Sequence, residues 1–258
     1  MQKEVPEKRW ELAQKAEKSL WESIPKNFIE EHSKYYIKKA EYLKNILIKY
    51  KKIDSRTKFL QIGCACADII NYLDIGEKYS IDPLADFYKS HFKLDYKKSR
   101  LISGMGEKLP YADNNFDVII LANVLDHTQN PKKVLSEVNR VLKRDGLLYF
   151  ENHFYQKGFL ILSKFYSQVK RLFFGQLFNP CHPHMFLLKE LREIISGDFE
   201  MIFEEEIGKD IENEVNNTEE LKKLLMKEKL SRKIPAFFGL FGTINFTCLC
   251  SKKVKNGV

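Results

Sequence analysis

The stretch FDVIILANVLDHTQNPKKVLSEVNRVLKRDGLLYFEN, residues 116–152, contains three successive apolar patterns. Residues 116–122 are nearly all apolar, as is typical of a strand that is covered on both faces. Residues 131–142 begin with a proline and place their apolar residues on one side of a helix. Residues 146–152 form another apolar run of strand length. A strand, a helix and a strand in this order predict two parallel strands joined by a crossover helix.

The same alternation continues toward both ends of the chain. Apolar runs of strand length predict further strands at 58–63, 78–82, 100–103, 199–207 and 242–251. Helical spacing predicts helices within 7–50, 68–73, 159–174, 182–195 and 217–230. We therefore expect an α/β fold with a doubly wound, mostly parallel, seven-stranded Rossmann-like sheet. Helices should cover both faces of this sheet, and a helical preface should precede it.

Changes in pattern divide the chain of 258 residues into four parts, and this length suits one large domain with small additions. Residues 1–54 are expected to form a helical extension with lysine-rich outer faces. Residues 55–155 should form the cofactor-binding Rossmann-like core. Residues 156–186 interrupt the alternation and are expected to form a helical lid or substrate-cover insertion. Residues 187–258 return to the same sheet.

The charge of the chain suggests acidic partners but does not locate a site for them. Lys and Arg number 43 against 35 Asp and Glu, so the formal net charge is +8. The lysine pairs, such as Lys38-Lys39 and Lys132-Lys133, are scattered among acidic residues. A basic patch with interleaved aromatic residues, typical of nucleic-acid binding, is not visible in this pattern. We expect a solvated basic surface and no nucleic-acid partner.

Two segments bear on membranes and on cellular location. The N-terminal residues are charged throughout and lack the apolar core of a signal peptide, so we expect a cytoplasmic protein. The segment 234–250 is uncharged and about as long as a short membrane span. Pro235 and Gly239 interrupt it, and from Thr243 its residues alternate as a strand does. This pattern predicts a loop followed by a buried strand.

Five cysteines, an odd number, make a disulfide framework unexpected in a chain without secretory features. Cys64 and Cys66, and again Cys248 and Cys250, are separated by one residue, which leaves zinc as an alternative. Structural zinc sites usually separate paired cysteines by two to four residues. We therefore expect small buried thiols and no metal site.

Unusual residues gather where the predicted strands end. Gly63 follows the first strand and allows a tight turn under a ligand. Asp82 ends the second strand, where an acid can accept hydrogen bonds from ribose hydroxyls. Asn123, Asp126 and His127 follow the strand at 116–122. In doubly wound sheets the ligand lies beyond the carboxyl ends of the strands, so these residues predict the binding site.

At this point the chain resembles the class I methyltransferases that use S-adenosylmethionine, in their small-molecule, type 11-like branch. The resemblance covers residues 57–155 well and continues loosely to about residue 207. Its best-matched motif runs from Gly106 to Glu151: Leu-Pro-aromatic, a polar turn, Phe-Asp, a strand, Leu-x-His, a Pro-led helix and a turn into the next strand. The resemblance implies S-adenosylmethionine as cofactor and S-adenosylhomocysteine as product.

The resemblance also implies cofactor contacts residue by residue. The loop from Gly63 to Ala67 would lie against the methionine part, and Asp82 would bind the ribose. Pro83 and Leu84 would line the adenine side. The remaining implied contacts are Gly106 and Glu107 beside the adenine, and backbone of Ala122 and Asn123 near the amino-acid end. The full set of implied cofactor residues is Gln61, Gly63, Cys64, Ala65, Asp82, Pro83, Met105, Gly106, Glu107, Ala122 and Asn123.

The chain departs from the family pattern at four positions. Gln61 stands where an acid is usual, and Met105 stands where an aspartate often binds the adenine amino group. Ala65 and Ala67 replace glycines; alanine is tolerated where φ is negative but costs about 1 kcal/mol or more where φ is positive. We expect negative φ at Ala65 and a usable loop. These departures leave a catalytically inert binding or scaffold module as an alternative.

The expected reaction is direct transfer of the methyl group to a small-molecule, sugar or lipid-linked acceptor, with a hydroxyl as the accepting group. A hydroxyl needs a base, and His127 is the first candidate, with Asp126 to orient it. His153 and His184 are further candidates, and each histidine could instead bind backbone at a turn. An NAD(P)-dependent oxidoreductase is a weaker alternative, because it would need a G-x-G-x-x-G loop that GCACAD does not supply.

The segment 157–174 combines an aromatic stripe with basic residues at Lys164, Lys170 and Arg171. Such a helix can pack over the core with its apolar side. It can also lie on a membrane surface or hold a lipid-linked acceptor. We expect this segment to cover the substrate, and of the two interpretations we favour the helix that packs over the core.

Overall fold

The computed structural model describes residues 4–66, 68–92, 99–155, 157–174, 180–207 and 243–253, with a seven-stranded sheet at its centre. The strands are β1 (Lys58–Ile62), β2 (Glu77–Asp82), β3 (Arg100–Ser103), β4 (Phe116–Ala122), β5 (Leu142–Tyr155), β6 (Phe199–Ile207) and β7 (Thr243–Lys252). The α-helices are α1 (Glu7–Glu22), α2 (Phe28–Glu31), α3 (Ser33–Tyr50), α4 (Ala85–Phe92), α5 (Pro131–Val141), α6 (Lys157–Phe174) and α7 (Leu188–Ile195), and the 3-10 helices are η1 (Ile69–Tyr72) and η3 (Leu125–His127).

The strand order is β3-β2-β1-β4-β5-β7-β6. β1 to β5 pair in parallel, whereas β7 runs antiparallel to both β5 and β6. The switch in direction from β1 to β2 on one side and to β4 on the other leaves a crevice at the carboxyl ends of β1 and β4. The expected fold class, a mostly parallel Rossmann-like sheet with an N-terminal helical preface, is confirmed.

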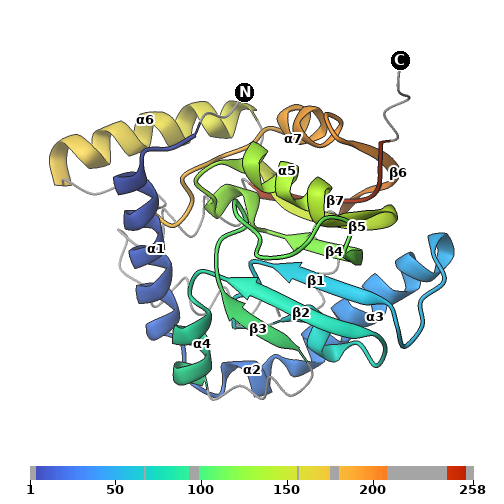
Figure 1. The fold of residues 1–258 in the computed structure, drawn as a ribbon. Coiled ribbons are helices and arrows are strands. Elements are labelled where there is room, and N and C mark those ends of the chain that lie inside the picture. The colour runs from blue at the N-terminus through green and yellow to red at the C-terminus, as the bar shows by residue number, and fades with distance from the viewer. Residues whose placement is uncertain are drawn as a thin grey trace.

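Helices cover both faces of the sheet, and the alternating side chains of the strands explain why (Figure 1). Leu60, Ile119 and Leu148 belong to one core cluster, which α5 and α7 complete. Phe59 and Ile120, their neighbours along the strands, belong to the opposite cluster, which α3 completes. Central strands that are apolar on both faces are therefore buried on both faces, as the pattern of residues 116–122 predicts.

Helix α5 forms where its sequence specifies a start. The Asn130 side chain accepts a hydrogen bond from the Lys133 backbone N at 3.2 Å, and Pro131 occupies the first turn. An amide cap and a proline that lacks an N–H satisfy the first turn of a helix without further partners. Val134 and Val138 then face the sheet, and both are fully buried.

The N-terminal helix α1 stands at the edge of the sheet where β1 and β2 end (Figure 1). The Trp21 ring meets Tyr88 and Phe92 of α4 edge to face, at 5.9 and 6.0 Å between ring centroids. Aromatic pairs in this geometry contribute about 0.5–1.5 kcal/mol beyond the area that they bury. The helical preface is therefore held against the carboxyl ends of the strands and contributes to whatever binds there.

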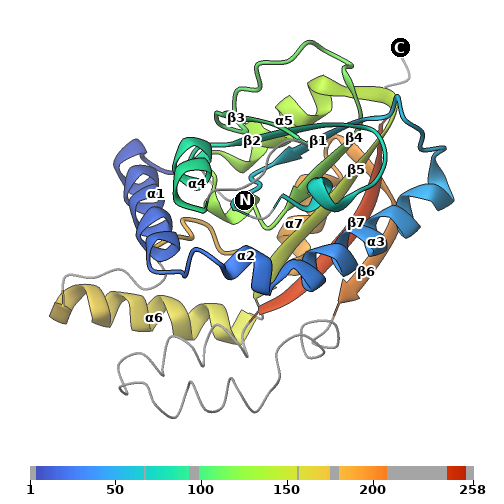
Figure 2. The same cartoon turned by 90° about the horizontal axis from the view of Figure 1, so that it is seen from below.

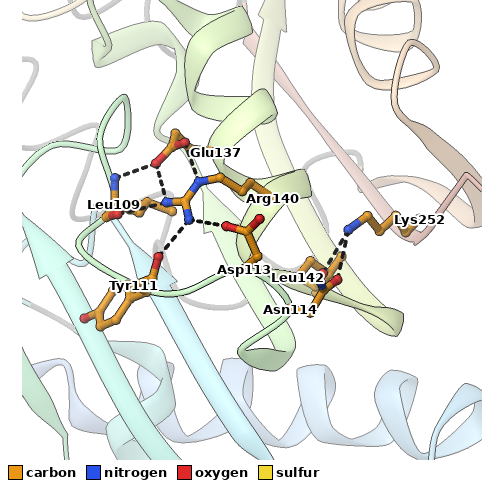
Figure 3. Close-up of polar contacts among 8 residues, drawn as sticks. All are labelled: Leu109, Tyr111, Asp113, Asn114, Glu137, Arg140, Leu142 and Lys252. Carbon is orange, nitrogen blue, oxygen red and sulfur yellow. Dashed lines mark hydrogen bonds and ion pairs between the residues drawn. The ribbon is translucent and has the colours of Figure 1, made fainter.

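Arg140 of α5 ties the loop before β4 to the domain (Figure 3). Its guanidinium donates to the carbonyl oxygens of Leu109 and Tyr111 at 3.0 and 2.8 Å and to the carboxylates of Asp113 and Glu137 at 2.8 Å. Glu137 in turn accepts the Leu109 backbone N–H at 2.8 Å. A planar group with five donors is suited to hold carbonyl and carboxylate oxygens at once.

Replacing Arg140 by methionine is expected to lower the free energy of unfolding by about 1–3 kcal/mol, because partly buried oxygens lose their donors. Urea denaturation would measure this change. Arg144→Met is the matched control, since Arg144 is exposed, and its effect should stay within about 0.5 kcal/mol. Equal stabilities of the two variants would show that the network around Arg140 contributes nothing to stability.

One predicted helix differs from the structure, and another lies outside the described residues. The helix expected at 68–73 is only the short 3-10 turn η1. The Gln61 side chain takes the Ile70 backbone N–H at 3.2 Å, and the Asp68 carboxylate accepts from the hydroxyls of Ser80 and Ser99. Side chains that bind nearby backbone in this way compete with helix formation. The helix expected at 217–230 lies outside the described residues.

Candidate active site

The loop after β1 turns sharply at Gly63. Gly63 has φ +65°, and its backbone N–H donates to the Ile81 carbonyl at 2.8 Å. A Cβ added at this position would lie 2.6 Å from Cγ2 of Val124. Both the left-handed backbone and the close approach require glycine. The chain can therefore turn from β1 into the loop only because residue 63 has no side chain.

Ala65 contradicts our expectation for this loop, since its φ is +48°. Its backbone N–H donates to Oδ2 of Asp82 at 2.9 Å. This hydrogen bond reaches across 17 residues of sequence and aligns the turn with the end of β2. An alanine in left-handed backbone costs about 1–2 kcal/mol. The loop therefore carries strain that a glycine would remove; Ala67 lies outside the described residues.

Ala65→Gly is expected to raise the free energy of unfolding, or to tighten cofactor binding, by about 1 kcal/mol. Thermal unfolding with and without cofactor measures both effects. Ala112→Gly is the matched control: Ala112 is an exposed loop alanine outside the positive-φ residues, so its replacement should be slightly destabilising. The same sign of change in both variants would contradict strain at Ala65.

Asp82 lies where β2 ends and is only 6% exposed. Its two carboxylate oxygens accept the backbone N–H groups of Ala65 and Leu84 at 2.9 and 2.8 Å. Burial raises the pKa of Asp82 to about 6, although the two N–H donors oppose this rise. Each carboxylate oxygen keeps a further acceptor position. Asp82 can therefore accept hydroxyl donors from a ligand, and it does so best when it is ionised.

A cavity of about 630 Å³, open mouth included, lies at the carboxyl ends of β1, β2 and β4. Seven of the predicted cofactor residues line it: Gly63, Ala65, Asp82, Pro83, Gly106, Glu107 and Asn123. Leu84 and His127 line it as well. Neighbouring elements of the sheet thus bring together residues that are spread over more than sixty positions of sequence.

Four predicted cofactor residues are not part of the cavity wall. Gln61 instead braces η1 through its hydrogen bond to the Ile70 backbone. Cys64 is buried in a small cluster with Ala85 and Leu101. Met105 and Ala122 are likewise absent from the lining. The cofactor roles of these residues stay predictions, and the contacts of Gln61 and Cys64 are those of residues that support the loop from behind.

Asn123 supplies an observation on what the cavity accepts. Its backbone has φ +54°, its backbone N–H donates to the Glu151 carbonyl at 2.7 Å, and its Nδ2 donates to the Glu151 carboxylate at 3.1 Å. Its Oδ1 is buried without a hydrogen-bond partner among the residues that the structure describes. A buried acceptor without a donor is costly. Together with the acceptor positions on Asp82, it fits a ligand that carries several N–H or O–H donors, as S-adenosylmethionine does.

Glu151 fixes the side chain of Asn123, and two further hydrogen bonds fix the carboxylate of Glu151. Its carboxylate accepts from Lys39 Nζ at 2.8 Å and from the Tyr149 hydroxyl at 3.0 Å. Burial would raise the pKa of Glu151, but the facing Lys39 ammonium keeps it below its usual value. This buried ion pair joins α3 to the ends of β4 and β5. It makes the cavity wall at Asn123 rigid.

The short helix η3 carries the buried Asp126 and the cavity-lining His127. Oδ2 of Asp126 accepts from Nδ1 of His182 at 2.7 Å and lies 4.0 Å from Nε2 of His127. Asp126 therefore orients His182 rather than His127, which differs from the sequence prediction. Burial would raise the pKa of Asp126, but the two facing imidazoles hold it well below its usual range. Burial would lower the pKa of His182, and the Asp126 carboxylate raises it.

The sequence did not point to His182 or to helix α1 as parts of the site. The ring of His182 lies 4.2 Å from that of His127 between centroids, and α1 contributes Trp10, Gln14 and Glu17 to the cavity lining. The motif His-Pro-His at residues 182–184 is a weak indication of a catalytic histidine, and in the sequence analysis it pointed to His184 and not to His182. The apolar spacing of residues 7–22 predicts a helix with one buried side. It does not indicate that this helix faces a ligand.

The other predicted histidines lie farther from the cavity. His184 is 1% exposed, and its backbone N–H donates to the Asp126 carbonyl at 3.2 Å. Burial lowers the pKa of His184, so its ring favours the neutral state. His153 is half-buried on β5, and its charge contributes to lowering the pKa values of Asp126 and Glu151. Neither lines the cavity, so a catalytic role for His153 stays a prediction.

All five cysteines are free thiols, and four of them are buried. Sγ of Cys248 lies 3.4 Å from Sγ of Cys250 within β7. Burial, with the aspartates nearby, raises the pKa of the Cys64 thiol well above its usual value. Among the described residues, the group that could hold a metal ion contains no cysteine. The thiols behave as small apolar residues of the core.

The sheet order, the glycine turn after β1 and the acid at the end of β2 define a class I methyltransferase domain, the cofactor of which is S-adenosylmethionine. Residues 60–150 match the family described as "Methyltransferase domain". The class and the cofactor expected from the resemblance are thereby confirmed.

Individual relatives agree with this assignment. The thiol S-methyltransferase TMT1B of Rattus norvegicus is 35% identical over 112 residues, 40% of this chain and 45% of the rat protein. The demethylmenaquinone methyltransferase of Bacillus pumilus is 25% identical over 204 residues, 72% of this chain and 85% of that protein. The crystal structure of YcgJ from Bacillus subtilis superposes with a TM-score of 0.52 at 18% identity, covering 82% of this chain and 98% of YcgJ. The chain spans about half the length of the first of these relatives.

Proposed function

We propose that this chain transfers a methyl group from S-adenosylmethionine to a hydroxyl of a small-molecule, sugar or lipid-linked acceptor. The observation that supports it best is the cavity at the switch point of the sheet, which Asp82, Asn123 and His127 all line. Small-molecule sites in doubly wound sheets lie at this place.

The residues of the cavity fit the cofactor. Asp82 would accept the ribose hydroxyls, and Pro83 and Leu84 would line the adenine side. Oδ1 of Asn123 is a buried acceptor that the cofactor's ammonium group could satisfy. When bound, the cofactor supplies a methyl group that its sulfonium already activates. The protein mainly has to align the acceptor with that group.

His127 has the position of a general base in this reaction. It lines the cavity beside Asn123, and its side chain is 24% exposed, so an acceptor can reach it. Its Nδ1 lies 3.6 Å from Oε2 of Glu17. A general base at this position would take the proton of an acceptor hydroxyl. A hydroxyl acceptor would need this help because its proton is lost reluctantly.

Isothermal titration with S-adenosylmethionine, S-adenosylhomocysteine and NAD tests the proposal. Binding of the first two between submicromolar and tens of micromolar concentrations, and none of NAD, is the expected result. Binding of NAD alone would support an oxidoreductase, and binding of none of them would support an inert module. Binding without turnover on any acceptor would support a scaffold that has kept the cofactor.

A thiol acceptor is the second candidate, because a relative of this chain is a thiol S-methyltransferase. The two acceptors make different demands on the base. A thiol has a pKa of about 8.5 and is partly ionised near neutral pH, whereas a sugar hydroxyl is not. Rates with paired hydroxyl and thiol acceptors, with and without His127, would therefore identify the accepting group.

Helix α6 supports a further proposal, peripheral contact with a membrane. It extends away from the sheet in Figure 2, and Ile161, Phe165, Leu172 and Phe173 on it are 63–80% exposed. Leu160 is buried, so one side of its first turns packs on the domain. Among the described helices, none is long and apolar enough to cross a membrane. An exposed apolar side on a basic helix is typical of binding at a lipid surface.

Co-sedimentation with vesicles that contain about one-third anionic lipid would test this contact. We expect the chain to bind, and a Phe165→Ser, Phe173→Ser variant to lose most of the binding, because apolar area and basic charge act together. Leu12→Ser is the matched control, since Leu12 is 52% exposed on α1. Equal sedimentation of all three proteins would exclude α6 as the lipid-binding surface.

A further inference from the structure

Three side chains, of which His127 lines the cavity, converge in a way that the proposed reaction does not require. One ligand atom each from Asp126, His127 and His182 lies within 4.8 Å of the other two. Asp126 and His127 come from η3, whereas His182 lies 56 residues after Asp126. We propose that these three residues bind a divalent transition-metal ion, with Zn²⁺ as the first candidate.

The geometry lies close to that of a metal site. Oδ2 of Asp126 is 2.7 Å from Nδ1 of His182 and 4.0 Å from Nε2 of His127. Ligand atoms that share a zinc ion are held about 2.0–2.2 Å from it, which separates them by roughly 3–3.5 Å. Nε2 of the partly exposed His127 would have to approach Oδ2 of Asp126 by about 0.5–1 Å, and Nδ1 of His182 would have to move away from it by about 0.5 Å. Metal binding would therefore need only side-chain adjustment.

A second observation points to a missing partner at this place. Asp126 is 1% exposed, and its other oxygen, Oδ1, has no hydrogen-bond partner among the described residues. Buried carboxylates are normally paired, fully hydrogen-bonded or bound to a metal ion. A cation bound by both oxygens of the carboxylate and by the two imidazoles would give Oδ1 the partner that the histidines alone do not supply.

The donor set selects the kind of ion. Two imidazole nitrogens and one carboxylate oxygen suit zinc, iron, cobalt or nickel, whereas Mg²⁺ and Ca²⁺ prefer oxygen ligands. Three protein ligands leave positions open, as in catalytic metal sites. Glu17 stands beside the set, with Oε2 at 3.6 Å from His127 Nδ1, and can accept the other ring N–H. Such outer carboxylates commonly orient metal-binding histidines.

The bound ion would also have a catalytic role. This role rests on the proposed function, whereas metal binding itself does not. His127 belongs to both the cavity lining and the metal set. A metal ion lowers the pKa of a hydroxyl or thiol that binds to it. The acceptor would lose its proton to solvent, and its oxygen or sulfur would form the new bond to the methyl carbon as the bond from carbon to the sulfonium breaks.

The test is direct titration of the full chain with Zn²⁺, in competition with a chromophoric chelator, after removal of bound metal. One equivalent should bind with a Kd of roughly micromolar or tighter. Co²⁺ in place of Zn²⁺ should produce visible absorption bands typical of nitrogen and oxygen ligands. His182→Ala should weaken binding by roughly a hundredfold, because it removes one of three ligands. His32→Ala is the matched control, since His32 binds the Phe28 carbonyl and lies outside the set, and it should bind as the parent does.

Cofactor titration of the same metal-free proteins separates this inference from the proposed function. His182 is not in the cavity lining, so His182→Ala should still bind S-adenosylmethionine, which also shows that it is folded. Failure to bind Zn²⁺ or Co²⁺ at about 1 mM, or equal affinity in His182→Ala and the parent, overturns the metal site whatever the cofactor does. Zinc binding that depends on His182 supports the site even if S-adenosylmethionine does not bind.

Discussion

His127→Ala is expected to lower the rate of methyl transfer to a hydroxyl by roughly a hundredfold or more and to leave cofactor affinity nearly unchanged. His127 of η3 lines the cavity, as do Asp82 at the end of β2 and Asn123 after β4. A base acts on the proton of the acceptor and not on the sulfonium. Single-turnover rates with saturating cofactor measure the chemical step, and calorimetry measures the affinity.

Two comparisons make this result specific. His32→Ala should keep the parent rate, because His32 lies outside the cavity lining. Removal of His127 should lower the rate of methyl transfer to a thiol less than the rate to a hydroxyl, since part of the thiol is already ionised. A full rate in His127→Ala with a hydroxyl acceptor would exclude both a base and a catalytic metal ion at this position. Zinc titration then distinguishes between those two roles if the rate does fall.

Asp82→Ala is expected to weaken binding of S-adenosylmethionine by about 1–3 kcal/mol, which corresponds to roughly 5- to 150-fold in Kd. The carboxylate would lose its hydrogen bonds to the ribose hydroxyls, and Ala65 would lose the acceptor that holds its backbone. Asp82→Asn is the companion variant, because it keeps the volume and one acceptor oxygen. Unchanged affinity in a folded Asp82→Ala protein would remove Asp82 from the site.

The pH dependence of binding gives an independent check on Asp82. Burial raises the pKa of Asp82 to about 6. Hydroxyl donors favour the ionised form, so affinity should be constant above pH 6 and fall by up to tenfold per pH unit below it. Asp82→Asn should remove this dependence. For the protein without cofactor the sign is reversed: a raised carboxyl pKa means that the contribution of Asp82 to stability is complete below about pH 4 and is lost as pH rises through 6.

The positions of the strands follow from the sequence to within a few residues. The segment predicted at 116–122 coincides with β4, and the segment predicted at 58–63 extends one residue beyond β1. Apolar runs that must be buried on both faces have few alternative conformations, so local pattern is sufficient to identify them. The same pattern, with Gly63 and Asp82 at the ends of strands, also located the cavity.

The backbone of the loop after β1 could not be predicted in this way. Nothing in the neighbouring residues requires a positive φ at Ala65, and alanine by itself disfavours it. The conformation depends on a hydrogen bond to Asp82, which is 17 residues away, and on the approach of Val124 to Gly63. Contacts between distant segments decided this angle against the local preference.

The sequence by itself therefore determined the class of fold, the order of its elements and the residues at the strand ends, because these depend on periodicity and on burial near in sequence. Only the tertiary structure decided which side chains share the site. It placed His182 against Asp126 across 56 residues and set Glu17 of the N-terminal helix beside His127. Such contacts arise from the packing of whole helices and loops on the sheet, and a pattern of neighbouring residues contains no record of that packing.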